Sequence, residues 1–131
     1  MIEFIVELAD RPGSLAEFAH RLATAGVNIE ALAGWNANGD GVVRMVVNDP
    51  AAARRVLTEA GIRHDERPVV TISLPNRPGA LADMAGSLAS AGVNIEAVYV
   101  LGGGGEALRI AMAVDETESV AALLERRLPD A

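Results

Sequence analysis

The spacing of apolar positions changes within the first part of the chain. Ile2, Phe4, Val6 and Leu8 occupy every second position at the start of the chain, and Glu3 and Glu7 stand between them. A period of two predicts a β-strand with one buried and one solvated face. From Leu15 to Ala23 apolar residues recur every three or four positions, which predicts an amphipathic helix. The chain is therefore expected to begin with a strand and a helix.

Turn and cap residues delimit the following elements. Gly26 is typical of a helix C-terminus, and Asn38–Gly41 predicts a hairpin turn because its residues accept positive φ. Asp49-Pro50 predicts the start of a second helix, with proline at the first helical position. The remaining expected elements are strands at 28–35 and 42–47, the second helix ending at Gly61, and an extended segment at 62–70.

Two stretches of the sequence occur twice at one offset. Residues 10–16 (DRPGSLA) match 76–82 (NRPGALA), and residues 25–31 (AGVNIEA) match 91–97 with no difference. Both pairs lie 66 positions apart. Two matches in one register indicate an internal duplication, and the period exceeds that of solenoid repeats. We therefore expect two copies of one small domain, at residues 1–66 and 67–131.

The element order in each copy is β-α-β-β-α-β, the ferredoxin-like arrangement, so the expected fold class is α+β within the broad α/β group. It has one antiparallel sheet with two helices on one face. In the second copy Gly102–Gly105 predicts a hairpin tip, and Asp115 with Glu118 predicts a capping box for the last helix. Few residues follow Leu128, so the last strand of the second copy is expected to be short or missing.

The repeated motifs resemble the ACT domain family. The resemblance rests on a strand, Asp/Asn-x-Pro-Gly, an amphipathic helix and then Ala-Gly-Val-Asn-Ile, and this series occurs twice. ACT domains are regulatory modules that commonly bind free amino acids where two domains meet, and some chains consist of tandem ACT domains alone. The resemblance thus implies a ligand site at Asp10, Arg11, Pro12, Gly13, Ser14, Leu15, Asn28 and Ile29, and at Asn76, Arg77, Pro78, Gly79, Ala80, Leu81, Asn94 and Ile95.

The chemistry of a zwitterion points to the same turn. An amino acid needs donors for its carboxylate and acceptors for its ammonium. The first amides of a helix lack partners, so Gly13, Ser14 and Leu15 are expected to offer free N–H groups to a carboxylate. Asp10 is expected to accept hydrogen bonds from the ammonium, and the Asn28 amide can both donate and accept.

Purely structural roles for these residues stay open at this point. Asp10 can serve as a helix cap, Pro12-Gly13 can serve only to shape a turn, and Asn28 can simply follow a glycine cap. Trp35 is a candidate to line a pocket, to anchor an interface or to be buried. Because Asp10 is charged and Asn76 is neutral, we hypothesise that the first site holds the ammonium more tightly.

Composition excludes several classes of protein. The net charge is −7 and all eleven basic residues are scattered arginines, so no basic stripe suits nucleic acid. Cysteine is absent, the two histidines are far apart, and no apolar run approaches bilayer-spanning length. We therefore expect no metal, no cofactor, no membrane association, and a cytoplasmic location.

The expected function is regulatory. No paired carboxylates or nucleophile–base pair emerges from the sequence, so an enzyme is not expected. The leading hypothesis is a small-molecule-sensing protein that binds a free amino acid at ACT domain interfaces and forms a homodimer. The alternative is a non-catalytic subunit that oligomerises with, or docks on, an enzyme of amino-acid metabolism without binding a ligand.

Overall fold

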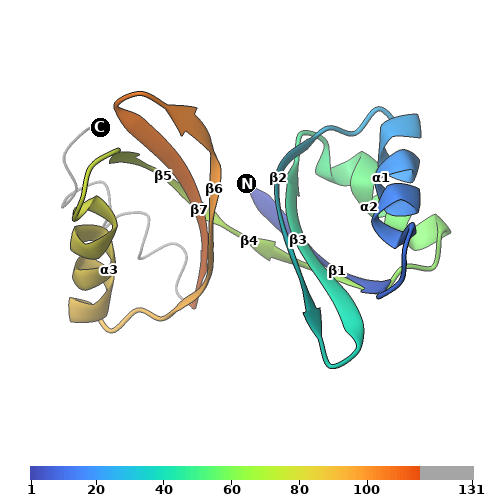
Figure 1. Cartoon of the computed structure of the whole chain (residues 1–131), viewed down its shortest axis with the longest axis horizontal. Helices are drawn as coiled ribbons and strands as arrows, with labels where there is room; N and C mark the ends of the chain where they lie inside the picture. Colours follow the sequence, from blue (N-terminus) through green and yellow to red (C-terminus); the bar gives the residue numbers. More distant parts are fainter. Residues whose placement is uncertain (116–131) are drawn as a thin grey trace. The chain divides into compact units, whose positions relative to one another are not determined.

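The computed structural model describes residues 1–115 (Figure 1). The chain separates into two compact units, Ile2–Arg67 and the residues from Pro68 onward together with Met1. We call Ile2–Arg67 module one and the described residues from Pro68 module two. Module one is a small sheet with two helices, and the described part of module two is a small sheet with one helix, so the predicted tandem ferredoxin-like fold is confirmed.

Module one has the full β-α-β-β-α-β order. Its sheet has the strand order β2-β3-β1-β4, and β3 pairs antiparallel with both β1 and β2. The expected fourth strand is therefore present, at one edge of the sheet. The elements are β1 (Ile2–Ala9), α1 (Ser14–Thr24), β2 (Ile29–Ala37), β3 (Asp40–Val47), α2 (Pro50–Glu59) and β4 (His64–Pro68).

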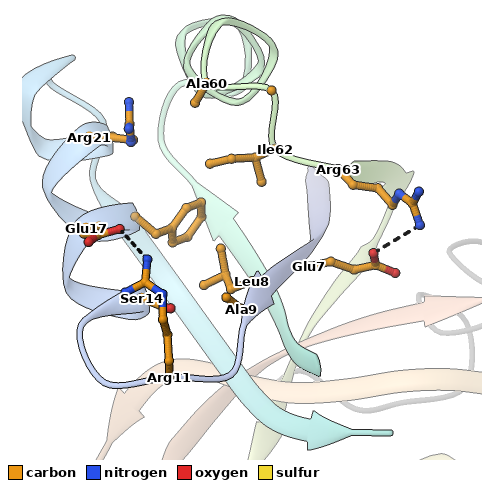
Figure 2. A pocket seen from close by; sticks show the side chains of 12 residues that line it. Glu7, Leu8, Ala9, Arg11, Ser14, Glu17, Arg21, Ala60, Ile62 and Arg63 are labelled. Atoms are coloured by element: carbon orange, nitrogen blue, oxygen red, sulfur yellow. Dashed lines mark hydrogen bonds and ion pairs between the residues drawn. The ribbon is translucent and has the colours of Figure 1, made fainter. Parts of the chain in front are cut away.

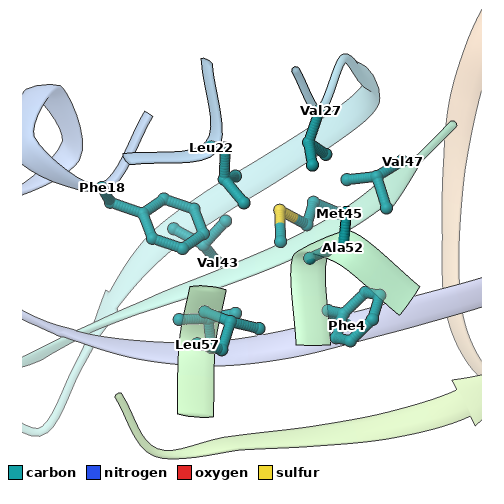
Figure 3. Close-up of a cluster of buried hydrophobic side chains, with 11 residues drawn as sticks. Phe4, Phe18, Leu22, Val27, Val43, Met45, Val47, Ala52 and Leu57 are labelled. Atoms are coloured by element: carbon teal, nitrogen blue, oxygen red, sulfur yellow. The ribbon is translucent and has the colours of Figure 1, made fainter. Parts of the chain in front are cut away.

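The core of module one lies between the sheet and its two helices. Phe4 and Val6 on β1 are fully buried, and Phe18 and Leu22 from α1 belong to the same cluster of buried side chains (Figure 3). The period of two in the strand and the three-to-four spacing in the helix bring these side chains to one layer. The cluster is aliphatic apart from two phenylalanines, and its buried members are Phe4, Val6, Phe18, Leu22, Val27, Val43, Met45, Val47, Ala52, Ala53 and Leu57.

The predicted hairpin turn of module one and the caps of its helices are confirmed. Asn38 and Gly39 have φ of 53° and 87° at the tip of the β2–β3 hairpin, as a two-residue turn between twisted strands requires. Gly26 has φ of 75° directly after α1. The Asp49 carboxylate accepts a hydrogen bond from the Ala52 amide at 3.1 Å and caps α2.

One expectation for β1 is wrong. Glu3 lies on the face opposite the helices, where the alternation predicts a solvated side chain, yet its exposed fraction is 0%. Both of its carboxylate oxygens accept from Arg44 Nη1 at 3.1 Å. Val46, opposite Glu3 on β3, is also fully buried. The face without helices is therefore partly covered, and the carboxylate is paired with a guanidinium as burial requires.

Module two repeats the scheme. Its described sheet has the strand order β5-β7-β6, again antiparallel. Met84 and Leu88 on its helix are fully buried against the sheet. The predicted last helix and last strand of this copy lie outside the described residues. The elements are β5 (Val70–Pro75), α3 (Ala80–Ser90), β6 (Ile95–Gly104) and β7 (Ala107–Val114).

Two details of module two differ from expectation. The hairpin tip lies at Gly105 and Glu106, because Gly102–Gly104 pair with β7 as part of β6. A register shift between Val100 and Gly102 adds one residue to this strand relative to β2. As a result Asp115 takes the place of Asn48, and its carboxylate accepts from the Asn94 amide at 3.1 Å. Its proposed partner Glu118 lies outside the described residues.

Candidate functional site

The repeated turn of module one connects β1 to α1. The Arg11 amide donates to the Ala9 carbonyl at 3.0 Å, and the Ser14 amide donates to the Arg11 carbonyl at 3.3 Å. Gly13, directly before the helix, has φ of 89° and ψ of −13°. Residues with a Cβ rarely adopt this left-handed conformation, so the turn requires glycine. The turn is thus held by its own backbone.

A hollow of about 330 Å³ lies beside this turn, and we call it the loop hollow. Asp10, Arg11 and Ser14 give it a polar end. Leu15, Leu32 and Trp35 add apolar side chains that are 50%, 45% and 47% exposed. The remaining lining comes from β1 and β3, at Leu8, Ala9, Gly41, Val42 and Val43, and from Gly34. The hollow therefore combines charges of both signs with an exposed apolar wall.

Asp10 does not cap the helix. The N-terminus of α1 has no side-chain cap hydrogen bond, and the Asp10 carboxylate instead accepts from the Asn36 side-chain amide on β2. The strand register explains the contact. Asp40 on β3 pairs with Ala9 on one side and with Ala37 on the other, so the ends of β1 and β2 are level with each other. A single hydrogen bond leaves carboxylate lone pairs for a further donor.

The helix amides differ from expectation at one position. The Ser14 N–H is bonded to Arg11, so it is not free. The Gly13 and Leu15 amides make no hydrogen bond within residues 1–115. Arg11 lies over the turn, with Nη1 donating to the Pro12 carbonyl at 3.4 Å and Nη2 bonded to Glu17 at 3.3 Å. Two amides and an exposed guanidinium thus remain as donors.

Asn28 and Ile29 lie at the other end of the sheet. Ile29 pairs with Val47, whereas the hairpin beside Asp10 joins the opposite ends of the same strands. The Asn28 amide donates to Asn48 Oδ1 at 2.8 Å, and the Asn48 amide donates back to the Asn28 carbonyl at 3.1 Å. Within one module, therefore, the asparagine and the turn do not meet. Asn94 and Ile95 take the same places in module two.

The turn of module two has the same backbone. Gly79 has φ of 88°, and the Ala80 amide donates to the Arg77 carbonyl at 3.3 Å. Arg77 Nη1 donates to the Pro78 carbonyl at 3.2 Å. Asn76, however, donates its side-chain amide to the Gly105 carbonyl at 3.1 Å, the reverse of the bond that Asp10 accepts. Leu81 is exposed beside this turn, as Leu15 is in module one.

Sequence reasoning missed Asn36 and Leu32 and left the place of Trp35 open. The hairpin register brings Asn36 to Asp10, and a contact between strands leaves no local signal. Leu32 and Val98 lie 66 positions apart and are both exposed apolar residues at the edges of the described sheets, but this exposure follows from the strand order and could not be read from the sequence. Within residues 1–115 no cluster of His, Asp and Glu is placed to hold a metal. None of the helices in this part of the chain is long and apolar enough to cross a membrane.

Comparison with known proteins gives a consistent result. Residues 2–128 match a family model described as an ACT domain pair. The structure is similar to that of a protein from Bacteroides thetaiotaomicron, with a TM-score of 0.86 and 28% identity over 95% of this chain and 85% of that one. It is also similar to the ligand-free regulatory subunit of aspartate kinase from Thermus thermophilus, with a TM-score of 0.69 and 18% identity over 98% and 93% of the two chains. Among curated proteins none matches the sequence.

Proposed function

This chain belongs to the ACT domain family as a pair of such domains, and from that premise we propose that it binds a free amino acid as a regulatory signal. ACT pairs are ligand-sensing regulatory modules, and the protein is proposed to have no catalytic activity of its own. Its effect would be exerted by population shift, because a ligand that favours one arrangement of the protein changes what a partner recognises.

The loop hollow is the observation that carries this proposal. Its polar end presents the Asp10 carboxylate together with Arg11 and with the Leu15 amide, which has no hydrogen-bond partner within residues 1–115. An ammonium and a carboxylate held on one carbon atom require an acceptor and donors a few ångströms apart, and charge-assisted hydrogen bonds are the strong ones. The residue types at this end match both groups of an amino acid.

The apolar wall narrows the proposed ligand class. Leu15, Leu32 and Trp35 are about half exposed, so an occupant would remove their apolar surface from water. A charged ligand side chain would gain no partner from these residues. We therefore expect an amino acid with an aliphatic side chain in module one.

The exposed apolar residues also favour a second function, association without a ligand. Leu15 and Leu32 in module one, and Leu81 and Val98 in module two, are exposed next to edge strands β2 and β6. Edge strands offer unpaired backbone groups to another chain. On this hypothesis the protein is a homodimer or docks on an enzyme of amino-acid metabolism. Light scattering that gives a monomer mass at high concentration would contradict the homodimer.

A thermal-shift screen of the twenty amino acids tests the leading proposal. A ligand that binds only the folded state at a hundred times its Kd stabilises it by about 2.7 kcal/mol. We expect a rise in Tm with one or a few aliphatic amino acids, and a smaller rise in Asp10→Asn. Asp65→Asn removes the same charge from exposed β4, away from the loop hollow, and is the matched control. No shift with any amino acid at millimolar concentration would contradict the proposal.

A further inference from the structure

A second hollow lies on the other side of the turn in module one. Its volume is about 280 Å³, and we call it the arginine pocket (Figure 2). One wall is the end of β1, the second is α1, and the third is the connection from α2 to β4. The spacing of Ser14, Glu17, Phe18 and Arg21 puts all four on one face of the helix. Figure 2 shows Leu8 and Ile62 between that helix and the segment that carries Arg63.

The charges of the arginine pocket leave one guanidinium without a partner. Arg11 pairs with Glu17 at 3.3 Å, and Arg63 pairs with Glu7 at 3.5 Å (Figure 2). The Arg21 guanidinium makes no ion pair or hydrogen bond within residues 1–115. The pocket thus contains three arginines and two glutamates in a chain whose net charge is −7. Its excess charge is positive, and the free cation is Arg21.

A buried hydroxyl lies at the same place. Ser14 Oγ is inaccessible to solvent and has no hydrogen-bond partner in the described part of the chain. Burying a hydroxyl without a partner costs free energy, and such a group at the wall of a cavity suits a ligand that can accept a hydrogen bond from it. The helix begins at Gly13 without a side-chain cap, so the hydroxyl is not used there.

Module two lacks both groups. Its residues at the positions of Ser14 and Arg21 are Ala80, which is buried, and Ser87, which donates to the Asp83 carbonyl at 3.1 Å. The backbone of the two turns is nevertheless the same. The orphan hydroxyl and the free guanidinium are therefore a feature of module one rather than a requirement of the fold.

We infer that the arginine pocket binds a small organic carboxylate that has an aliphatic body and no ammonium group. Arg21 pairs with the carboxylate, as guanidinium groups do, and Ser14 Oγ donates to an oxygen of the ligand. Leu8, Phe18 and Ile62 contact the aliphatic body. Three arginines against two glutamates line the pocket, so its charge favours a ligand with a net negative charge over a zwitterion. An α-keto acid has this chemistry, whereas an amino acid does not.

The inference goes beyond the amino-acid site but is linked to it. Arg11 and Ser14 line both the loop hollow and the arginine pocket. A ligand in one hollow therefore changes the surroundings of groups that the other hollow uses, and binding at the two is expected to be coupled reciprocally. Of these two hollows, Asp10 lines only the loop hollow and Arg21 only the arginine pocket, so the two sites can be tested separately. Arg21 also lines a third hollow, between α1 and α2.

Calorimetric titration of the full chain with the α-keto acid of leucine, with leucine and with inorganic phosphate tests the inference. We expect the keto acid to bind, and Arg21→Ala to weaken it at least about tenfold, the equivalent of one lost charged hydrogen bond. Arg55→Ala removes an exposed arginine elsewhere and should leave the affinity unchanged. Ser14→Ala should weaken binding while preserving or raising Tm, because it removes an unpaired buried hydroxyl.

Three results would overturn the inference. The first is that the keto acid does not bind. The second is that phosphate binds equally well through Arg21. The third is that keto-acid binding is lost in Asp10→Asn but kept in Arg21→Ala. The last result would place the anion in the loop hollow. If leucine and the other amino acids fail to bind while the keto acid binds through Arg21, the amino-acid proposal fails and this inference stands.

Discussion

The two modules have one turn geometry and two chemistries. Gly13 and Gly79 agree within 1° in φ and 3° in ψ, and each turn is followed by an arginine-to-acid pair, at 3.3 Å in module one and 3.6 Å in module two. Yet Asp10 accepts a hydrogen bond from its hairpin where Asn76 donates one. The backbone of each turn is set by its glycine and its own backbone hydrogen bonds, whereas the binding chemistry depends on the side chains placed on it. A conserved shape in a duplicated chain therefore does not imply two equal sites.

The largest expected effect concerns the buried pair Glu3–Arg44. By the strand registers, module two has Val69 and Ala111 at these positions, and both are buried. Arg44→Ala removes the guanidinium that pairs with the buried Glu3 carboxylate and should lower the free energy of unfolding by about 3 kcal/mol. Chemical denaturation measures this. The double variant Glu3→Val/Arg44→Ala, which copies module two, should recover most of the loss, and an equal loss in both variants would contradict the account.

The next effect concerns ligand affinity. Asn76→Asp gives the turn of module two the carboxylate of module one, while removing the amide that bonds Gly105. If the charge at this position holds the ammonium, amino-acid affinity at module two should rise about tenfold, for a gain of about 1.5 kcal/mol from one charged hydrogen bond. Calorimetric titration of the variant and of the unmodified chain measures the change in affinity. Affinity that is unchanged would show that the acid alone does not distinguish the turns.

A smaller effect should be the same in both modules. Gly13→Ala and Gly79→Ala each place a Cβ at φ near +89°, where no backbone atom lies within 4 Å. The cost is then conformational, about 1 kcal/mol in each case. Thermal unfolding of the two variants should give similar shifts in Tm. A clear difference would mean that the two turns are held differently despite their matching geometry.

The smallest effect is a dependence on pH. Glu66 on β4 accepts two hydrogen bonds from Arg54 on α2, at 2.7 and 2.5 Å, and the bonded guanidinium holds the pKa of Glu66 below its usual value. A lowered folded-state pKa stabilises the protein above the unfolded pKa, about 4.3 for a glutamate. This contribution is lost as the pH falls through the folded pKa. Arg54→Ala should thus lower Tm slightly at neutral pH and leave it unchanged at pH values below both pKa values.

Local signals allowed much of the fold to be predicted. The period of two in β1, the helical spacing of α1 and the glycines at 26, 39 and 61 depend only on neighbouring residues, and the elements follow them. The burial of Glu3 did not follow, because it depends on what covers the other face of the sheet. The β6–β7 tip was misplaced because paired glycines resemble turn glycines in sequence.

The candidate site was predictable where it is contiguous. Asp10, Arg11, Ser14 and Leu15 were named from one motif, and the structure brings them to one hollow. Asn28 was named from the second motif, and the strand register places it at the far end of the sheet. The partners from β2, Leu32 and Asn36, required that register. Contacts between strands depend on pairing, which no local pattern in this chain specifies.

The most direct test of the central claim is a calorimetric titration of the unmodified chain and of Asp10→Asn with the amino acid that raises Tm most. The account predicts a tight site in the unmodified chain that weakens by about ten- to a hundredfold in the variant, as expected for a lost charged hydrogen bond. The heat of any weaker site in module two should be retained. Binding of equal strength in both proteins would contradict the claim that the Asp10 turn is the principal ligand site.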